Sequence, residues 1–171
     1  SYLDRCISIS KPTDLQSVIN KTILGDTFSI LPLLPTKFVD LLIADPPYNL
    51  DKNFNGKKFK KTSDEMYEEY TESWIKSVLP LLKEDATIYV CCDWQSSPTI
   101  GKVLKKYFYI QNRITWQREK GRGALSNWKN GMEDIWFCTV SDDYVFNLGA
   151  VRQRRKVVAP YTEDGKPKDW F

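Results

Sequence analysis

The stretch Val39-Asp40-Leu41-Leu42-Ile43-Ala44-Asp45-Pro46-Pro47-Tyr48 runs from apolar residues straight into a carboxylate, two prolines and an aromatic ring. An apolar run of this length, bounded by turn residues, predicts a fully buried strand of a parallel sheet over residues 39–44. In an open α/β sheet, ligands bind outside the carboxyl ends of the strands, which is where Asp45 would lie. The stretch therefore predicts a core strand and a ligand site at its end.

The segment Asp45-Pro46-Pro47-Tyr48 offers hydrogen-bond acceptors on a stiff backbone. Each proline fixes its own φ and lacks an N–H donor, and Pro47 also drives Pro46 into an extended conformation. A carboxylate and a carbonyl held in this way suit a planar group with an amino –NH2, such as a nucleobase, because they can accept both of its hydrogens. The ring of Tyr48 would stack on that base. The alternative is a tight turn chosen for rigidity alone.

Alternating helix and strand patterns follow this segment. Thr62 and Glu65 stand at capping-box spacing and predict the start of a helix. Its predicted apolar stripe consists of Tyr67, Tyr70, Trp74, Val78 and Leu81. A second helix is predicted over 98–106, with proline in its first turn. Strands are predicted at 86–92, 109–116, 135–140 and 144–146, the last two joined as a hairpin. This order predicts an α/β sheet with helices on both faces and an antiparallel edge.

Composition excludes several kinds of site. The chain contains no histidine, so Ser-His and Cys-His nucleophile pairs and His-containing zinc sites cannot form, and no metal site is expected. The cysteines at 6, 91, 92 and 138 show no Cys-x-x-Cys spacing and are predicted to be buried, reduced thiols. No apolar run approaches the roughly 18 residues of a membrane span, and no signal-peptide pattern is present. We therefore expect a cytoplasmic protein.

Positive charge is concentrated in three segments, although the formal net charge is only +3. Residues 52–61 hold five lysines and no acid, and residues 113–129 hold five basic residues against Glu119 alone. A third basic segment spans residues 152–156. Basic segments beside aromatic residues favour a polyanionic partner.

Together these features resemble the amino-group DNA methyltransferases that depend on S-adenosylmethionine. The Asp-Pro-Pro-Tyr segment after a strand resembles their catalytic motif. Ile23-Leu24-Gly25-Asp26 resembles the Gly-Asp segment that precedes this motif in one permuted group, in which the catalytic half comes first. Trp116, the basic insertion after it and Glu133 follow in the family's order. The resemblance covers about residues 20–150 and implies a Rossmann-like methyltransferase sheet, mostly parallel with an antiparallel edge hairpin.

The resemblance implies a role for each residue of the motif. Asp45 and the carbonyl of Pro46 would accept the amino hydrogens, and Pro47 would hold this geometry. Tyr48 would stack on a base that has been flipped out of the duplex. Methyl transfer would be a direct in-line displacement, with its rate supplied by positioning and desolvation.

The resemblance implies only part of a cofactor site. Gly25 and Asp26 would bind S-adenosylmethionine, Asp26 at the adenosyl end, and Asp45 would lie close to the methyl donor. The permuted group ends with a Phe-x-Gly-x-Gly loop, which is absent before Phe171, so the sheet is expected to be incomplete at its C-terminus. We expect residues 1–171 to form the catalytic half of a methyltransferase domain. Either the chain is a fragment, or the rest is disordered, or a second polypeptide completes the fold, as a homodimer partner or a complementing chain that carries the glycine-rich loop.

A long polar insertion over about residues 117–131 is the predicted target-recognition segment. The candidate DNA-binding residues are Arg118, Lys120, Arg122, Asn127, Trp128, Lys129, Lys57 and Lys58. Their basic side chains would neutralise phosphates, and Arg122 and Asn127 would reach base edges. Trp128 would act as a wedge or a stacking platform; the alternative is a solvated loop whose Trp128 packs on the body. Lys57 and Lys58 belong to a segment that would clamp the nucleotide backbone, act as a lid or be a plain loop.

The predicted function is site-specific DNA adenine-N6 methylation in a bacterial restriction-modification system. Aspartate as the first residue of the motif favours N6-adenine within the resemblance, whereas the physics of the motif does not separate adenine from cytosine. Four alternatives remain: an N4-cytosine enzyme, an RNA adenine methyltransferase, an enzyme that methylates a glutamine amide, and a non-catalytic DNA-binding subunit that needs a second chain.

Overall fold

The computed structural model describes residues 3–54, 57–122, 126, 128, 130–153 and 162–167. The main elements are β3 (Val39–Ala44), α2 (Asp64–Val78), β6 (Leu82–Cys92), α3 (Ser97–Tyr107), β7 (Tyr109–Arg122) and β8 (Asn130–Thr139). The shorter elements are η1 (Leu3–Arg5), β1 (Cys6–Ile7), β2 (Thr22–Ile23), α1 (Thr27–Ile30), η2 (Leu31–Leu33), β4 (Lys52–Phe54), β5 (Lys57–Phe59), η3 (Leu79–Leu81), α4 (Leu148–Val151), β9 (Thr162–Glu163) and β10 (Lys166–Pro167). None of the helices in this part of the chain has the length and apolarity that crossing a bilayer requires.

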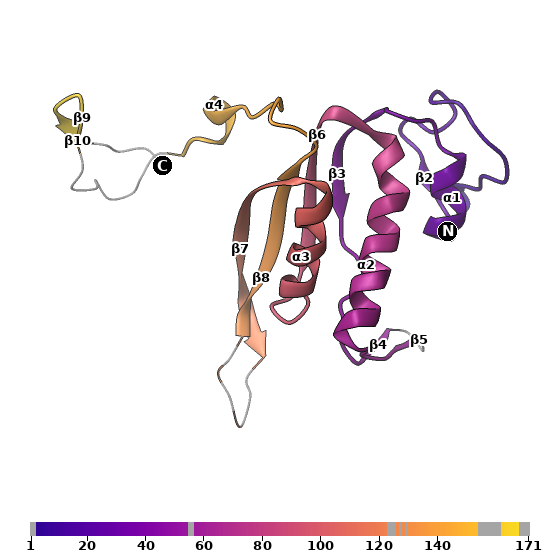
Figure 1. Cartoon of the computed structure of the whole chain (residues 1–171), viewed down its shortest axis with the longest axis horizontal. Helices are drawn as coiled ribbons and strands as arrows, with labels where there is room; N and C mark the ends of the chain where they lie inside the picture. Colours follow the sequence, from indigo (N-terminus) through magenta and orange to yellow (C-terminus); the bar gives the residue numbers. More distant parts are fainter. Residues whose placement is uncertain are drawn as a thin grey trace.

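The central sheet has the strand order β3-β6-β8-β7. Strands β3 and β6 are parallel, with Ala44 opposite Val90, whereas β8 runs antiparallel to both β6 and β7. Figure 1 shows α2 and α3 side by side on one face of this sheet. The predicted α/β class with an antiparallel edge is therefore confirmed. The prediction of helices on both faces is not met by the described residues, because both longer helices lie on the same face.

Helix α2 begins at Asp64, because the side chain of Ser63 accepts a hydrogen bond from the Met66 amide (3.3 Å) and caps the helix. The capping-box pattern had placed the cap at Thr62, which is wrong. The Thr62 amide instead donates to the side chain of Asn49 (2.8 Å). Acidic residues in the first turn favour this helix start through the helix dipole. The helix passes at Leu79 into η3, where a proline stands at the first turn.

The core lies between β6 and the two helices. The largest fully buried apolar side chains are Ile75, Ile88, Val90, Ile100, Val103 and Leu104. Helix α3 approaches the sheet closely at Gly101, where an added Cβ would lie 2.5 Å from Cζ2 of Trp136 on β8. The predicted stripe of α2 is confirmed, since its members are buried except for Tyr70, which is half-buried.

Strand β3 is half-buried rather than fully buried, which corrects the prediction made from its apolar run. Leu42 and Ala44 pack against the helix-covered core, but Leu41 and Ile43 are 53% and 67% exposed. Successive side chains of a strand point to opposite faces, so these two residues mark the face opposite the helices. In the described part of the chain this second face carries further exposed apolar side chains, among them Ile114 and Trp116.

The predicted strand at residues 144–146 is not formed. The hairpin at this edge of the sheet consists instead of β7 and β8, with Trp116 opposite Glu133. Strand β8 is hydrogen-bonded to β6 on one side and to β7 on the other, so it has no free edge for a further strand. The rings of Tyr144 and Phe146 pack on Phe137, each with its centroid 6.0 Å from that ring.

Two further sequence expectations are refined. The basic segment after β3 is not a plain loop, because Lys52–Phe54 and Lys57–Phe59 pair as the antiparallel hairpin β4–β5. The prediction that the four cysteines are buried holds only for Cys92 and Cys138, whereas Cys6 and Cys91 are half-buried.

Candidate active site

The loop after β3 places Asp45 at the carboxyl end of a parallel strand. The last paired residue of β3 is Ala44, so the chain leaves the sheet at Asp45. The Asp45 side chain is exposed and Pro46 is half-buried. The carboxylate therefore lies at the surface and not in the core, as expected for a ligand-binding group.

Tyr48 lies against Asp45. Its hydroxyl donates a hydrogen bond to Oδ1 of Asp45 across 3.1 Å. Burial raises the pKa of Tyr48, and the neighbouring carboxylate of Asp45 raises it further, so the phenol is neutral and acts as a donor. The stacking role of the Tyr48 ring stays a prediction.

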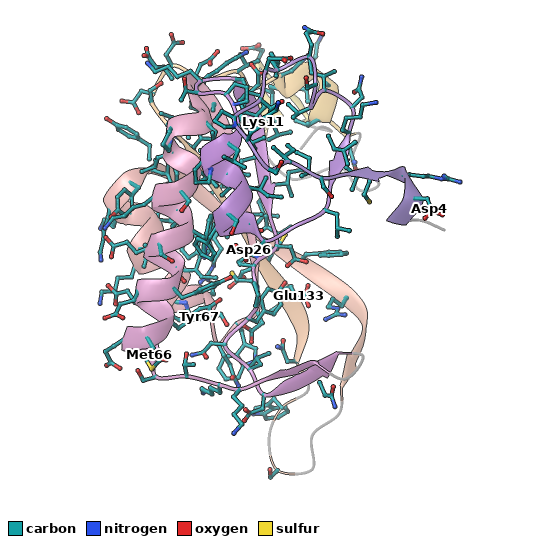
Figure 2. The ribbon with its side chains drawn as sticks, turned by 90° about the vertical axis from the view of Figure 1, so that its right-hand side faces the viewer. Asp4, Lys11, Asp26, Met66, Tyr67 and Glu133 are labelled. Carbon is teal, nitrogen blue, oxygen red and sulfur yellow. The ribbon has the colours of Figure 1, made fainter. Side chains whose placement is uncertain are left out.

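The rest of the loop is fixed to α2 and to the start of α3. The amide of Asn49 donates to Oγ of Ser96 (3.0 Å), and the Asn49 side chain donates to the carbonyl of Thr62 (3.1 Å). The hydroxyl of Tyr67, on α2, donates to the carbonyl of Pro47 (2.9 Å). Figure 2 labels Tyr67 on this helix. The Pro-Tyr-Asn part of the motif is thus held at both ends by buried side chains.

Strand β8 adds a second carboxylate, Glu133, to this edge of the sheet. In the register of β6 and β8, Cys92 lies opposite Asp134, so Glu133 stands just beyond the carboxyl end of β6. Burial raises the pKa of the Cys91 thiol, and the carboxylates of Asp45 and Glu133 raise it further. The same two carboxylates also raise the pKa of Tyr48. Both carboxylates therefore lie near these two side chains.

Glu133 is a site residue that the sequence did not single out for a role. Its carboxylate forms a hydrogen-bonded ion pair with Arg118 of β7. Its position depends on the pairing of strands that are distant in sequence, so no local pattern would have revealed it. Arg118, predicted to bind DNA, is thus also a partner of a carboxylate at the candidate site.

Gly25 and Asp26 precede helix α1. Oδ1 of Asp26 accepts hydrogen bonds from the amide and the hydroxyl of Ser29, both at 2.9 Å, and so caps the helix. Figure 2 shows Asp26 at this end of α1. A side chain at Gly25 would contact Ile30. Both residues therefore have a local structural role, and their predicted part in cofactor binding stays a prediction.

The predicted target-recognition segment is partly strand. Lys120 and Arg122 lie on β7, and Lys57 and Lys58 lie on β5, but the side chains of these four residues are outside the described ones. Asn127 and Lys129 also lie outside the described residues. Trp128 is 96% exposed, so the alternative in which it packs on the body of the protein is wrong.

Comparison with known families identifies the chain. The family described as "DNA methylase" (N6_N4_Mtase) matches residues 39–169. The chain belongs to the N6/N4 DNA methylase family. The match begins with β3 and includes the Asp-Pro-Pro-Tyr loop and the β7–β8 hairpin. The methyl donor of this methylase family is S-adenosylmethionine, as the resemblance implied.

Two curated members of the N6/N4 family show how much of the protein the chain spans. It is 27% identical to the DNA adenine methyltransferase YhdJ of Escherichia coli (strain K12) over 143 residues, which are 82% of this chain and 48% of YhdJ. It is 32% identical to the type II methyltransferase M1.MboII of Moraxella bovis over 136 residues, 78% of this chain and 51% of the relative. The chain spans about half the length of these relatives.

Solved structures confirm the Rossmann-like methyltransferase fold of the family. The PvuII DNA methyltransferase (cytosine-N4-specific) superimposes with a TM-score of 0.61 at 16% identity, covering 84% of this chain and 54% of that one. The putative DNA modification methylase TTHA0409 of Thermus thermophilus, complexed with S-adenosyl-L-methionine, gives 0.53 at 17% identity, covering 74% and 56%. At these identities the likeness concerns the fold alone.

Proposed function

We propose that this chain is the catalytic half of a site-specific DNA adenine-N6 methyltransferase of a restriction-modification system. The observation that carries the proposal is the exposed carboxylate of Asp45 at the end of β3, followed by two prolines and a tyrosine. The family match and the curated DNA methyltransferases among its relatives support a DNA substrate. Because that DNA lies in the cytoplasm of a bacterium, a cytoplasmic location is part of the proposal.

Recognition of the amine would rest on two acceptors. The carboxylate of Asp45 takes one hydrogen of the exocyclic nitrogen, and the carbonyl of Pro46 takes the other. The nitrogen lone pair of adenine is delocalised into the ring, which makes it a poor nucleophile. Two acceptors that bind both hydrogens in a tetrahedral arrangement favour localising that lone pair. The chain needs no histidine base for this step, in accordance with its composition.

Tyr48 would serve the base in two ways. Its ring stacks on the flipped base, a contact worth roughly 1–3 kcal/mol. Its hydroxyl, hydrogen-bonded to Oδ1 of Asp45 at 3.1 Å, would share the carboxylate with the amine or give way to it, because a carboxylate accepts several hydrogen bonds. Pro47 limits the backbone freedom of the loop.

The charge at this edge of the sheet suits the proposed cofactor. When bound, S-adenosylmethionine supplies an electrophilic methyl group on a sulfonium. Asp45 is an exposed carboxylate whose negative charge complements a cation, whereas Glu133 is paired with Arg118. Gly25 and Asp26 are the proposed residues at the adenosyl end.

Adenine is proposed over cytosine because the motif begins with aspartate. Relatives with both specificities exist, since YhdJ is named an adenine methyltransferase and the PvuII enzyme is cytosine-N4-specific. The N4-cytosine enzyme and the RNA adenine methyltransferase therefore remain the alternatives that use the same chemistry.

A further segment is proposed to complete the domain. The face of the sheet opposite α2 and α3 exposes Leu41, Ile43, Ile114 and Trp116, and the chain matches only about half the length of its relatives. A segment that carries a glycine-rich cofactor loop would cover this face, supplied by the rest of a longer protein, by a homodimer partner or by a complementing chain. A non-catalytic DNA-binding subunit is the rival, and it predicts no cofactor binding.

The experiment is methyl transfer from labelled S-adenosylmethionine by the protein as its gene encodes it. Random-sequence duplex DNA, single-stranded RNA and protein are offered as substrates, and the methylated product is identified by mass spectrometry. N6-methyladenine in DNA, confined to one sequence motif, is expected. N4-methylcytosine or methylated RNA would move the function to the corresponding alternative, and no cofactor binding would favour the non-catalytic subunit.

A further inference from the structure

Tyr67 lies beside the candidate active site but is not one of the residues proposed to contact the target base. Helical spacing marks it only as a member of the apolar stripe of α2, and it is 5% exposed. Yet its hydroxyl donates to the carbonyl of Pro47 across 2.9 Å. Since buried donors are rarely left unpaired, this contact fixes both the tip of the ring and the second proline of the loop.

A buried chain of hydrogen bonds also fixes the loop that Tyr67 contacts. The amide of Asn49 donates to Oγ of Ser96 (3.0 Å), and Ser96 is 1% exposed. Burial raises the pKa of Tyr67 to about 12, and the side chain of Ser96 opposes that rise. Tyr67 is therefore a neutral phenol at physiological pH, and its hydroxyl donates to Pro47.

Ser96 is itself held at the start of α3. Its amide donates to Oδ1 of Asp93 (3.0 Å), and Asp93 is a buried carboxylate that follows directly on β6. The loop after β3 is thus tied to α2 through Tyr67 and to the neighbouring parallel strand through Ser96 and Asp93. Two rigid elements fix its position relative to the sheet.

We propose that Tyr67 is a positioning residue for methyl transfer: its hydroxyl holds the Pro47 carbonyl, so that the adjacent Pro46 carbonyl and Asp45 stay oriented toward the target amine. The inference rests on the proposed function. A hydrogen bond to Pro47 turns that carbonyl toward α2, which leaves the Pro46 carbonyl as the acceptor for the base. Small displacements of reacting groups slow catalysis strongly, by about 10²-fold for 1 Å.

The test compares Tyr67→Phe with Tyr70→Phe in the protein as its gene encodes it. Both changes remove one phenolic hydroxyl from α2, and the two rings stack on each other with centroids 6.0 Å apart. In the described residues the Tyr70 hydroxyl makes no contact with the loop, so Tyr70→Phe is the matched control. For Tyr67→Phe, kcat is expected to fall about 10- to 100-fold, while KM for DNA and the unfolding midpoint stay at the control values.

Hydrogen exchange gives a second readout that needs no turnover. The Asn49 amide is expected to exchange about tenfold faster in Tyr67→Phe than in Tyr70→Phe or the unaltered protein. Equal kcat and equal exchange in the two variants would overturn the inference. If the unaltered protein transfers no methyl group to any substrate, the proposed function fails. In that case the exchange rates of the Asn49 amide still test whether Tyr67 positions the loop. Equal rates in Tyr67→Phe and Tyr70→Phe would reject that role.

Discussion

The hydroxyl of Tyr48 and the carboxylate of Asp45 are hydrogen-bonded to each other across 3.1 Å. Both side chains are proposed to bind the same target base, one as an acceptor for its amine and one as a stacking surface. The phenol occupies only Oδ1, and an ionised carboxylate can accept several hydrogen bonds. The amine of the base would therefore join the phenol on Asp45 or replace it.

Removing only the Tyr48 hydroxyl separates the two roles of this side chain. Tyr48→Phe keeps the ring and abolishes the competing hydrogen bond, so we expect the affinity for a flipped base to be kept or raised. Tyr48→Ala removes the stacking surface and is expected to cost about 1–3 kcal/mol of binding free energy. Fluorescence of 2-aminopurine at the target position measures both. A Phe variant as weak as the Ala variant would contradict the stacking role.

Trp128 is expected to contribute to DNA binding and not to stability. Its side chain is 96% exposed, so Trp128→Ala should leave the free energy of unfolding within about 0.5 kcal/mol of its original value. Loss of a stacking platform should weaken DNA binding by about 1–3 kcal/mol. Trp128→Phe, which keeps an aromatic face, is the control for fluorescence-anisotropy titrations. Unchanged affinity in the Ala variant would remove Trp128 from the interface.

The contact between α2 and α3 should weaken in acid. The hydrogen bond from Tyr107, together with Lys76 and Lys106, lowers the pKa of Glu72 from 4.5 to about 2. A lowered folded-state pKa gives stability that is complete above about 4.5 and is lost as the pH falls toward about 2. We expect Glu72→Gln to be less stable than the unaltered protein at pH 7. This difference in stability should vanish as the pH falls from about 4.5 to about 2.

Urea unfolding at a series of pH values measures the difference. Glu69→Gln on the same helix is the control, because Glu69 is exposed and forms no ion pair among the described residues. If the gap between Glu72→Gln and the unaltered protein persisted at pH 2, the assigned origin of its stability would be wrong.

The close approach of α3 to β8 at Gly101 should tolerate no side chain. An added Cβ would lie 2.5 Å from Cζ2 and 2.9 Å from Cη2 of Trp136, and overpacking of this kind costs about 1–3 kcal/mol. Gly101→Val is expected to lower the free energy of unfolding by that amount. Gly149→Val meets only Asn147 at 3.4 Å and is the control. Equal stability of the two variants in thermal unfolding would refute the tight contact.

Local patterns in the sequence predicted the elements whose signals are local. The strand at Val39–Ala44 and the helix with its stripe from Tyr67 onward were recovered because period and turn chemistry are properties of neighbouring residues. The Asp-Pro-Pro-Tyr segment also carried its signal within a few positions. The exposure of Leu41 and Ile43 escaped prediction, because an apolar run does not reveal which face another layer covers.

Features that depend on distant parts of the chain were missed. The turn-like residues after Thr139 predicted a hairpin, but β8 already pairs on both edges with β6 and β7. Glu133 reaches the candidate site only through strand register, and the Tyr67 hydroxyl meets Pro47 only in the folded protein. Thr62 lost the capping role because Asn49, 13 positions earlier, bonds to it. In each case a tertiary contact outweighed the local preference.

The account depends most on Asp45 as the acceptor for the target amine. The direct measurement is the rate of methyl transfer by Asp45→Ala, with Asp40→Ala as the control, since Asp40 is an exposed carboxylate on the same strand that pairs with Lys83. DNA affinity and unfolding of both variants are measured beside it. The account predicts a loss of at least about 10²-fold in rate for Asp45→Ala alone, with affinity and stability kept. Turnover by Asp45→Ala close to that of the unaltered protein would contradict it.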